Sequence, residues 1–497
     1  MPAILTGSAR RIVALFPLAL VAGCAAAPDL GPPPTPRAPD SIAAGQTFAR
    51  IAAPTGAAEA PAWPADRWWR SYGDPQLDGL IEEGLRGSPD IAAALARLRR
   101  AGGLAEQAGA ALWPRLDVQG DATFDKQSYN NGFPKEFLPQ GWNDTGSVAA
   151  AAGFDLDLWG RNRAALAAAT SEARAALIDT RQAELMLTTA IARAYVELEY
   201  RFINHDIARA TLELRTANRD LIAQRQANGL ENRVSLRQAD ADAATARAGL
   251  GEATEALELI RHQIAALVGA GPDRGLALTR PTLAPASVGG LPADATTDLI
   301  GRRPDIAGAR ARVEAAASRI KVARADFYPA ISLSAIVGMQ SLGLDNLFKG
   351  GSTYGSVGPA ISLPIFHGGA LRGRYRSARA DYDEAVANYD RTVLAAYREV
   401  ADAATTERSL DQRVADARTA LAASREAYAL ARQRYDGGLS TYLDVLQIED
   451  RMLVAQSRLA TLESAARASD INLIGALGGG FDRTAAATVT TKDVPNG

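Results

Sequence analysis

The sequence predicts an α+β membrane protein with two internal repeats, in which short β-strands pooled from several chains form a barrel and long α-helices continue it. Three observations support this fold class: a duplicated order of segments, strands with strict polar–apolar alternation, and two very long runs without proline or glycine. Helices of such length without internal caps are typical of coiled coils and not of globular domains.

The N-terminus predicts export and lipidation. Residues 1–23 contain Arg10 and Arg11, followed by an apolar stretch that is far shorter than a membrane span, so they read as a signal peptide. The residues before Cys24 resemble a bacterial lipobox, so we expect Cys24 to become the lipidated N-terminus, which carries palmitate. Ala25 follows Cys24, where an aspartate would retain a lipoprotein in the inner membrane, so we expect this protein to be sorted to the outer membrane.

Composition excludes several classes of protein. Removing the signal removes two arginines and no acid, so the formal charge of −2 becomes −4, which gives no basis for nucleic-acid binding. The single cysteine excludes a disulfide scaffold, and the three histidines lie far apart, so we expect no metal and no cofactor. No later segment resembles a transmembrane helix, so any membrane crossing must use strands.

The repeat divides the chain. Pro89 and Pro304 each open an Ala/Arg-rich stretch, and each stretch ends 25 residues later at a second proline, Pro114 or Pro329. We expect the following organisation: signal peptide 1–23, lipidated tether 24–64, first repeat 65–280, second repeat 281–480 and a flexible tail 481–497. Each repeat is read as a helix, a strand hairpin and a long helical hairpin.

The segments after the second prolines read as strands. Leu116 to Phe124 alternate with Asp117 to Asp125, which gives one apolar and one polar face. The chain returns near residues 145–159, and the second copy repeats the pattern after Pro329. A soluble antiparallel sheet shows the same alternation, and membrane barrels show it too.

The helices favour the membrane reading. Residues 162 to about 228 would span roughly 100 Å at 1.5 Å per residue, and residues 373 to about 436 form the equivalent run of the second copy. Four strands cannot close a membrane barrel, which begins at about eight, and an open edge in lipid leaves backbone groups unpaired. Several chains must therefore pool their strands, above a helical stalk that suits a conduit.

Short motifs follow one another in a definite order along the chain. They are Trp68-Trp69-Arg70, Asp74-Pro75-Gln76-Leu77, Pro89-Asp90-Ile91, Trp113-Pro114-Arg115-Leu116, Phe154-Asp155-Leu156-Asp157-Leu158-Trp159-Gly160-Arg161, Ala266-Leu267-Val268-Gly269, Arg302-Arg303-Pro304-Asp305-Ile306, Tyr328-Pro329-Ala330-Ile331, Leu363-Pro364-Ile365-Phe366, Tyr435-Asp436-Gly437-Gly438-Leu439 and Tyr442-Leu443-Asp444-Val445-Leu446. In their order and spacing, over about residues 63 to 478, these motifs resemble the TolC-like outer-membrane factors, in the lipidated NodT-type branch.

The resemblance implies a trimeric outer-membrane β-barrel with four strands per chain, continued by a long α-helical periplasmic barrel. It implies a passive duct of a tripartite efflux pump that exports drugs or other small molecules. The partners would be a periplasmic adaptor (membrane fusion) protein, an inner-membrane proton-driven efflux pump and outer-membrane lipid.

In this family the periplasmic tip closes with inward-facing tyrosine and aspartate, and the matching positions are Tyr435 and Asp444. Carboxylates from three chains at one constriction would attract cations and would raise one another's pKa. Gln447 stands where a second aspartate occurs in some members, so the chain carries at most one such ring there. Thr441 to Asp444 also fits a capping box, so Asp444 has a structural role open to it as well. Gln226 and Ser235 occupy the matching places of the first copy.

Three other readings stay open. A non-conducting structural coiled-coil lipoprotein would share the helices, and an outer-membrane duct of a protein secretion system would share the fold. An enzyme is the weakest reading, because Asp155 and Asp157 have no accompanying nucleophile and base.

Overall fold

The computed structural model describes residues 27–38, 41–51, 62–130, 132–284, 291–292 and 294–482. The signal peptide, Cys24 and all but the first two residues of the tail lie outside the described residues. The chain divides into two compact units, and each contains parts of both repeats. One unit holds Arg99–Ala175 and Ala309–Asn388 with the described residues up to Pro36, and the other holds Arg37–Leu98, Ala176–Gly308 and the described residues from Tyr389.

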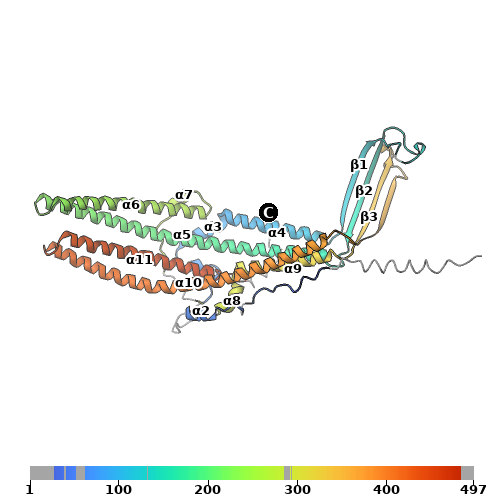
Figure 1. The fold of residues 1–497 in the computed structure, drawn as a ribbon. Helices are drawn as coiled ribbons and strands as arrows, with labels where there is room; N and C mark the ends of the chain where they lie inside the picture. The colour runs from blue at the N-terminus through green and yellow to red at the C-terminus, as the bar shows by residue number, and fades with distance from the viewer. Residues whose placement is uncertain are drawn as a thin grey trace, which may run out of the picture. The chain divides into compact units, whose positions relative to one another are not determined.

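The first unit contains an antiparallel sheet in the order β1-β2-β3-β4 (Figure 1). Its strands are β1 (Arg115–Asp125), β2 (Asn143–Asp155), β3 (Ala330–Leu342) and β4 (Thr353–Ser362). The predicted hairpins are confirmed, since β1 pairs with β2 and β3 with β4. The pairing of β2 with β3 joins the hairpins of the two repeats into one sheet.

The register places the apolar residues of all four strands on one face. Directly opposed residues share a face of a sheet, and one such row runs across the strands through Leu116, Ala152, Ala335 and Val357. A polar row through Asp121, Ser147 and Gln340 lies on the other face. Val118 and Val357 are 73% and 76% exposed, so no described part of the chain covers them on the apolar face.

A sharp corner leads from β2 into α5 (Arg161–Ala227). Asp157 has a left-handed backbone with φ 41°, and Gly160 has φ 73°. The Asp157 carboxylate accepts from the backbone N–H groups of Asn162 at 2.8 Å and Arg163 at 3.0 Å. These hydrogen bonds hold the pKa of Asp157 below its usual range against the opposing effect of burial, and they cap the helix.

The helices beside the sheet come from equivalent places in the two repeats. They are α4 (Pro89–Ala110), the start of α5, α9 (Pro304–Ala325) and the start of α10 (Ala370–Asp436). Arg319 of α9 contacts Glu172 of α5 at 2.8 Å, and Arg161 of α5 contacts Asp326, the residue after α9, at 2.7 Å.

The long helices are as predicted, and the two copies have equal lengths. Helices α5 and α10 each have 67 residues, and the returning helices α6 (Arg233–Leu267) and α11 (Tyr442–Ala476) each have 35. The turns use Gly229 at φ 73° and Gly438 at φ 74°, which glycine adopts at low cost. No described helix combines the length and the apolar character that a membrane span requires.

The second unit contains short helices beside the long ones. They are the 3-10 helix η2 (Trp68–Tyr72), α3 (Pro75–Gly87), α7 (Asp273–Leu276) and α8 (Ala295–Arg302). Buried residues of η2 and α3 pack on α5, α6 and α11 in one core cluster, whose members include Tyr72, Leu80, Ile81, Ile191, Tyr195, Ile264 and Ile471. Asp74 caps α3 through the N–H of Gln76 at 2.9 Å and accepts from Tyr195 at 2.8 Å.

The same close approach occurs once in each repeat. A Cβ on Gly269 would lie 2.3 Å from the Gly87 carbonyl oxygen, and one on Gly478 would lie 2.0 Å from the Arg302 carbonyl oxygen. Both glycines also have positive φ. Only glycine fits where the returning helix meets the segment that opens each repeat.

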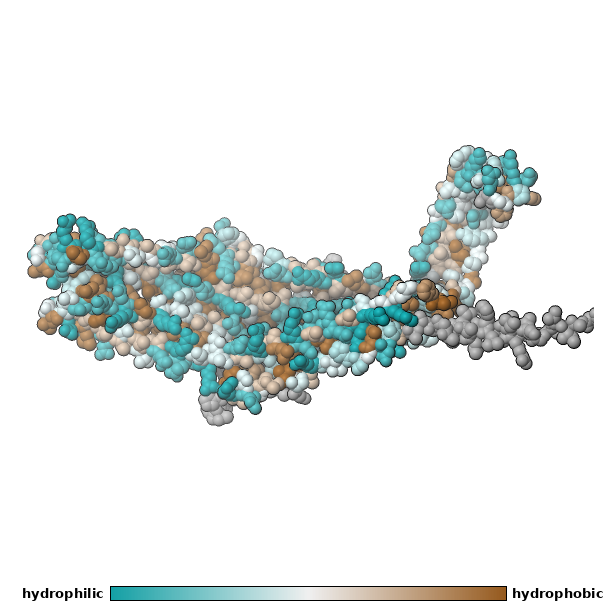
Figure 2. Space-filling model, in the orientation of Figure 1, coloured by the Kyte–Doolittle hydropathy of each residue, from teal (hydrophilic) through white to brown (hydrophobic). Residues whose placement is uncertain are grey.

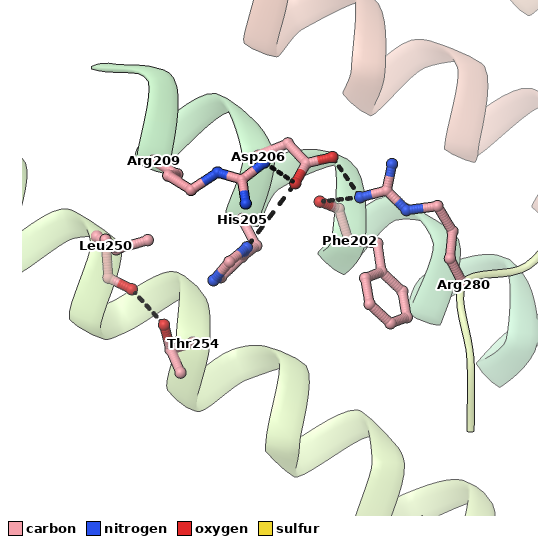
Figure 3. A network of polar contacts seen from close by, with 7 residues as sticks. All are labelled: Phe202, His205, Asp206, Arg209, Leu250, Thr254 and Arg280. Carbon is pink, nitrogen blue, oxygen red and sulfur yellow. Dashed lines mark hydrogen bonds and ion pairs between the residues drawn. The ribbon is translucent and has the colours of Figure 1, made fainter. Parts of the chain in front are cut away.

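A polar network fastens the segment after α7 to α5 (Figure 3). Arg280 forms an ion pair with Asp206, donates to the Phe202 carbonyl at 3.4 Å and lies over the Phe202 ring. Arg209 contacts the same carboxylate at 3.4 Å. Arg280 therefore holds the start of the connection between the two repeats against α5.

The described part of the tether is more ordered than an extended linker. In the first unit, Arg379 donates to the carbonyls of Gly31 at 3.1 Å and Pro32 at 2.6 Å. In the second unit, residues 45–51 form a helix, α2 (Gly45–Ile51), and Phe48 stacks on Tyr397 with ring centroids 5.9 Å apart. Main-chain carbonyls of a proline-rich segment are free to accept, because they take part in no regular structure.

Candidate functional site

The candidate gate lies at the turn between α10 and α11, in the second unit. Tyr435 is the penultimate residue of α10, and Asp444 is the third residue of α11. The equivalent turn between α5 and α6 lies against it, because Ile222 and Ala239 belong to the same buried cluster as Tyr435 and Tyr442. The structure therefore brings the two predicted residues to one end of the paired hairpins.

Asp444 caps the helix, as the sequence indicated. Its Oδ2 accepts from the Thr441 backbone N–H at 2.9 Å and the Thr441 hydroxyl at 2.8 Å, and the two residues form a reciprocal capping box. The hydrogen bond from the Thr441 N–H is the largest cause that holds the pKa of Asp444 below its usual range in the single chain. The Asp444 side chain is exposed, so its carboxylate caps the helix and still faces solvent.

Tyr435 packs at the turn. It is 5% exposed, its ring lies 6.0 Å from that of Tyr442, and the Arg225 guanidinium lies 5.1 Å over its face. Burial raises the pKa of the Tyr435 phenol, and its hydroxyl has no hydrogen-bond partner among the described residues. A buried hydroxyl without a partner costs free energy, and a hydrogen bond from outside the chain would offset this cost.

A hollow of 870 Å³ opens beside the turn, between α6 and the start of α11. Charged residues of both signs line it, among them Arg225, Glu231, Asp242 and Asp450. Leu230, Val234, Leu439 and Leu443 are 60–76% exposed at the same end of the hairpins. This end therefore offers apolar side chains and a polar hollow together.

A buried ionic cluster near the turn was not foreseen from the sequence. Glu449 of α11 is fully buried, and Arg215 of α5 lies 3.4 Å from it and also pairs with Asp450. Asn218 of α5 donates to Glu449 at 3.2 Å and accepts from Arg432 of α10 at 3.2 Å. Burial raises the pKa of Glu449, and Arg215 opposes this. Through Asn218, this cluster connects α5, α10 and α11 within one chain.

A second unforeseen group lies farther along α11. Asp470 is 1% exposed, and Tyr72 donates to its Oδ2 at 2.5 Å. Burial raises the pKa of Asp470 to about 6. Burial, together with the nearby charges of Asp470 and Asp411, raises the pKa of Glu407 of α10 to about 7. In the sequence both acids look like members of an exposed helical face, and no local signal marks them. Within the described part of the chain, no three Asp, Glu, His or Cys side chains group as a metal site requires.

Comparison with known proteins gives the family. A family model described as outer membrane efflux protein matches residues 80–270 and 296–479. The fusaric acid resistance protein FusA of Burkholderia cepacia is 37% identical over 329 residues, which cover 64% of this chain and 60% of FusA, less than two thirds of that protein. The multidrug resistance outer membrane protein MdtP of Escherichia coli K12 is 31% identical over 433 residues, which cover 84% of this chain and 87% of MdtP.

A solved structure agrees with this result. The outer membrane protein VceC of Vibrio cholerae superposes with a TM-score of 0.79 at 43% identity, over 84% of this chain and all of VceC. The predicted family, fold class and outer-membrane location with a periplasmic extension are confirmed by these matches. The chain belongs to the outer membrane efflux protein family.

Proposed function

We propose that three copies of this chain form a passive duct, anchored by a lipid on Cys24, that exports small organic molecules from the periplasm. The duct works with a periplasmic adaptor and a proton-driven pump of the inner membrane. FusA is named for resistance to fusaric acid and MdtP for multidrug resistance, which supports small organic compounds as the cargo.

The four-stranded sheet carries this proposal. Its apolar face is uncovered, and the outer edges of β1 and β4 pair with no described strand. Unpaired strand edges are not tolerated in lipid, because each unsatisfied backbone group costs several kcal/mol. Pairing β1 of one chain with β4 of the next satisfies both edges, and three chains then contribute twelve strands.

The gate is proposed at Asp444 and Tyr435. Three Asp444 carboxylates around one constriction form a negative ring that holds cations and slows their passage. Asp444→Asn keeps an acceptor for the Thr441 N–H and removes the charge, so it separates the gate from the cap. Thr441→Val weakens the cap and leaves the charge, which makes it the matched control.

Planar-bilayer recording of the full-length lipidated protein tests both proposals. We expect conductance from a stable trimer, block by divalent cations, and weaker block in Asp444→Asn but not in Thr441→Val. A folded trimer that does not conduct in either variant would favour a non-conducting structural lipoprotein. Unaltered cation block in Asp444→Asn would remove Asp444 from the gate and leave the duct intact.

The adaptor is proposed to dock on the exposed apolar residues of the two turns. Leu230 and Leu439 lie just after the turn glycines, at equivalent places in the two repeats, and are 66% and 73% exposed. We expect Leu230→Asp with Leu439→Asp to abolish adaptor binding in a pull-down while the trimer conducts normally. Unchanged binding would place the docking surface elsewhere. If the chain is instead the outer-membrane duct of a protein secretion system, cells that also express the inner-membrane component of that system should export a protein through it.

A further inference from the structure

A second hollow, of 580 Å³, lies in the first unit between the start of α5 and the end of α9. Its cations are Arg163, Lys321 and Arg324, and no acid is among its lining residues. Arg163 is tied to Asp157 at 3.2 Å, whereas Lys321 and Arg324 have no ion-pair partner among the described residues. The hollow therefore presents uncompensated positive charge.

Two aromatic rings form its end nearest the sheet. Trp159 stacks on Tyr328 with ring centroids 4.8 Å apart, and its indole N–H donates to the Pro329 carbonyl at 2.8 Å. The rings are still 51% and 39% exposed. The hydrogen bond and the stacking fix the indole in place, so its exposed face is a preformed surface.

This aromatic pair belongs to a wider girdle of exposed aromatic and aliphatic residues. In Figure 2, brown atoms gather where the strands meet the helices. The girdle comprises Trp113, Leu156, Leu158, Trp159, Tyr328, Ile365 and Phe366. Aromatic and apolar girdles mark the boundary of the hydrocarbon layer in outer-membrane proteins. Since the helices of this family extend into the periplasm, this girdle lies at the periplasmic leaflet.

Arg324 lies at the depth of the headgroups, and Lys321 lies about one helical turn farther from the hydrocarbon. At about 1.5 Å per helical residue, Arg324 is roughly 6 Å and Lys321 roughly 10 Å farther from the sheet than Tyr328. The polar layer of a bilayer adds about 5 to 8 Å on each side of the hydrocarbon. A phosphate held by Arg324 and Lys321 would thus sit directly below acyl chains that touch Trp159.

A neighbouring hollow of 400 Å³ is lined by other residues of α5 and α9, together with Leu104 of α4 and Arg374 of α10. The two hollows share no lining residue, so they lie on different faces of the α5 and α9 pair. A lipid in the cationic hollow requires that its face is the outer one in the assembled barrel.

We propose that this hollow binds the headgroup of an anionic glycerophospholipid in the periplasmic leaflet. Lys321, Arg324 and Arg163 hold the phosphodiester by charge-assisted hydrogen bonds, and Trp159 with Tyr328 contact the glycerol and the first acyl carbons. The inference rests on the outer-membrane placement of the sheet but not on conduction through the duct.

Tryptophan quenching by brominated lipid tests it. The full-length protein is reconstituted in phosphatidylethanolamine vesicles that contain a minor fraction of dibrominated phosphatidylglycerol or dibrominated phosphatidylcholine. We expect stronger quenching by phosphatidylglycerol, and we expect Trp159→Phe to remove the difference, which assigns the signal among the six tryptophans. Each cation near an anionic surface contributes about fivefold in affinity. The double variant Lys321→Gln with Arg324→Gln should therefore bind phosphatidylglycerol about 25-fold more weakly.

The matched control removes two cations at the other end of the sheet, Lys126→Gln with Lys349→Gln, and should keep the preference. Equal quenching by the two lipids in the native protein would overturn the proposal without any variant. So would an equal loss in the control, or full competition by soluble glycerol phosphate, which would indicate a free-anion site. A double variant that conducts normally and has lost the lipid preference supports the lipid site independently of the proposed duct.

Discussion

Replacing Asp470 with asparagine is expected to stabilise the protein above pH 6 and to leave its stability unchanged near pH 4. The carboxylate is 1% exposed, and its Oδ1 has no partner among the described residues. Burial raises its pKa from 3.8 to about 6, against the hydrogen bond from Tyr72, which lowers it. Asparagine still accepts that hydrogen bond and carries no charge.

The magnitude follows from linkage. The folded state holds the Asp470 proton more tightly than the unfolded chain, so the free energy of unfolding falls as the pH rises from about 4 to about 6 and is then level. A shift of about two pKa units corresponds to about 3 kcal/mol, or about a hundredfold in the unfolding equilibrium. Asp470→Asn removes this loss, and it also lowers the pKa of Glu407, which the Asp470 charge helps to raise.

Denaturant titrations at pH 4 and pH 8, followed by tryptophan fluorescence, measure the effect. Trp68 lies 6.2 Å from Tyr72 between ring centroids, so its emission reports unfolding at this place. Asp416→Asn, at an exposed acid of α10, is the control and should change stability little at either pH. A variant that matches the wild type at pH 8, or that is equally destabilised at both values, would refute the buried-charge reasoning.

Three further predictions concern stability. Arg303→Met should lower the free energy of unfolding by about 3 kcal/mol in thermal unfolding. The buried guanidinium pairs with Asp305 of α9 and Glu399 of α10 and donates to the Ala476 carbonyl at the end of α11. Arg303→Lys keeps the charge and should retain part of this stability. Gly269→Ala should destabilise the protein by more than about 2 kcal/mol, because a Cβ there would overlap the Gly87 backbone. Gly229 also has positive φ but lies in open space, so Gly229→Ala should cost about 1 kcal/mol. Equal losses in the two variants would contradict the close approach at Gly269. Thr441→Val should cost about 1 kcal/mol and speed amide exchange in the first turn of α11 alone.

Much of the fold could be predicted because its causes are local. The absence of proline and glycine predicted α5 and nearly all of α10, which begins at Ala370, before Gly373. The alternation after Pro114 predicted which residues of β1 share a face. The capping box at Thr441 and Asp444 was also readable, since it depends on residues three apart. These features need only the geometry of a helix or a strand, so neighbouring residues suffice to specify them.

The candidate site was predictable only in part. Tyr435 and Asp444 could be located, but the burial of Tyr435 under Arg225 depends on the other hairpin. Glu449 and Arg215 are 234 positions apart, and neither has a neighbour in the sequence that marks it as buried.

The sequence by itself determined the elements of this protein: the duplicated order, the long helices and the faces of the strands. Tertiary structure alone decided that β2 pairs with β3 and that Asp470 lies beneath Tyr72, and it gathered Lys321, Arg324 and Trp159 around one hollow. The physical reason is that periodicity and capping act over a few residues, whereas burial, pKa and charge clustering depend on which distant segments the packed chain brings together.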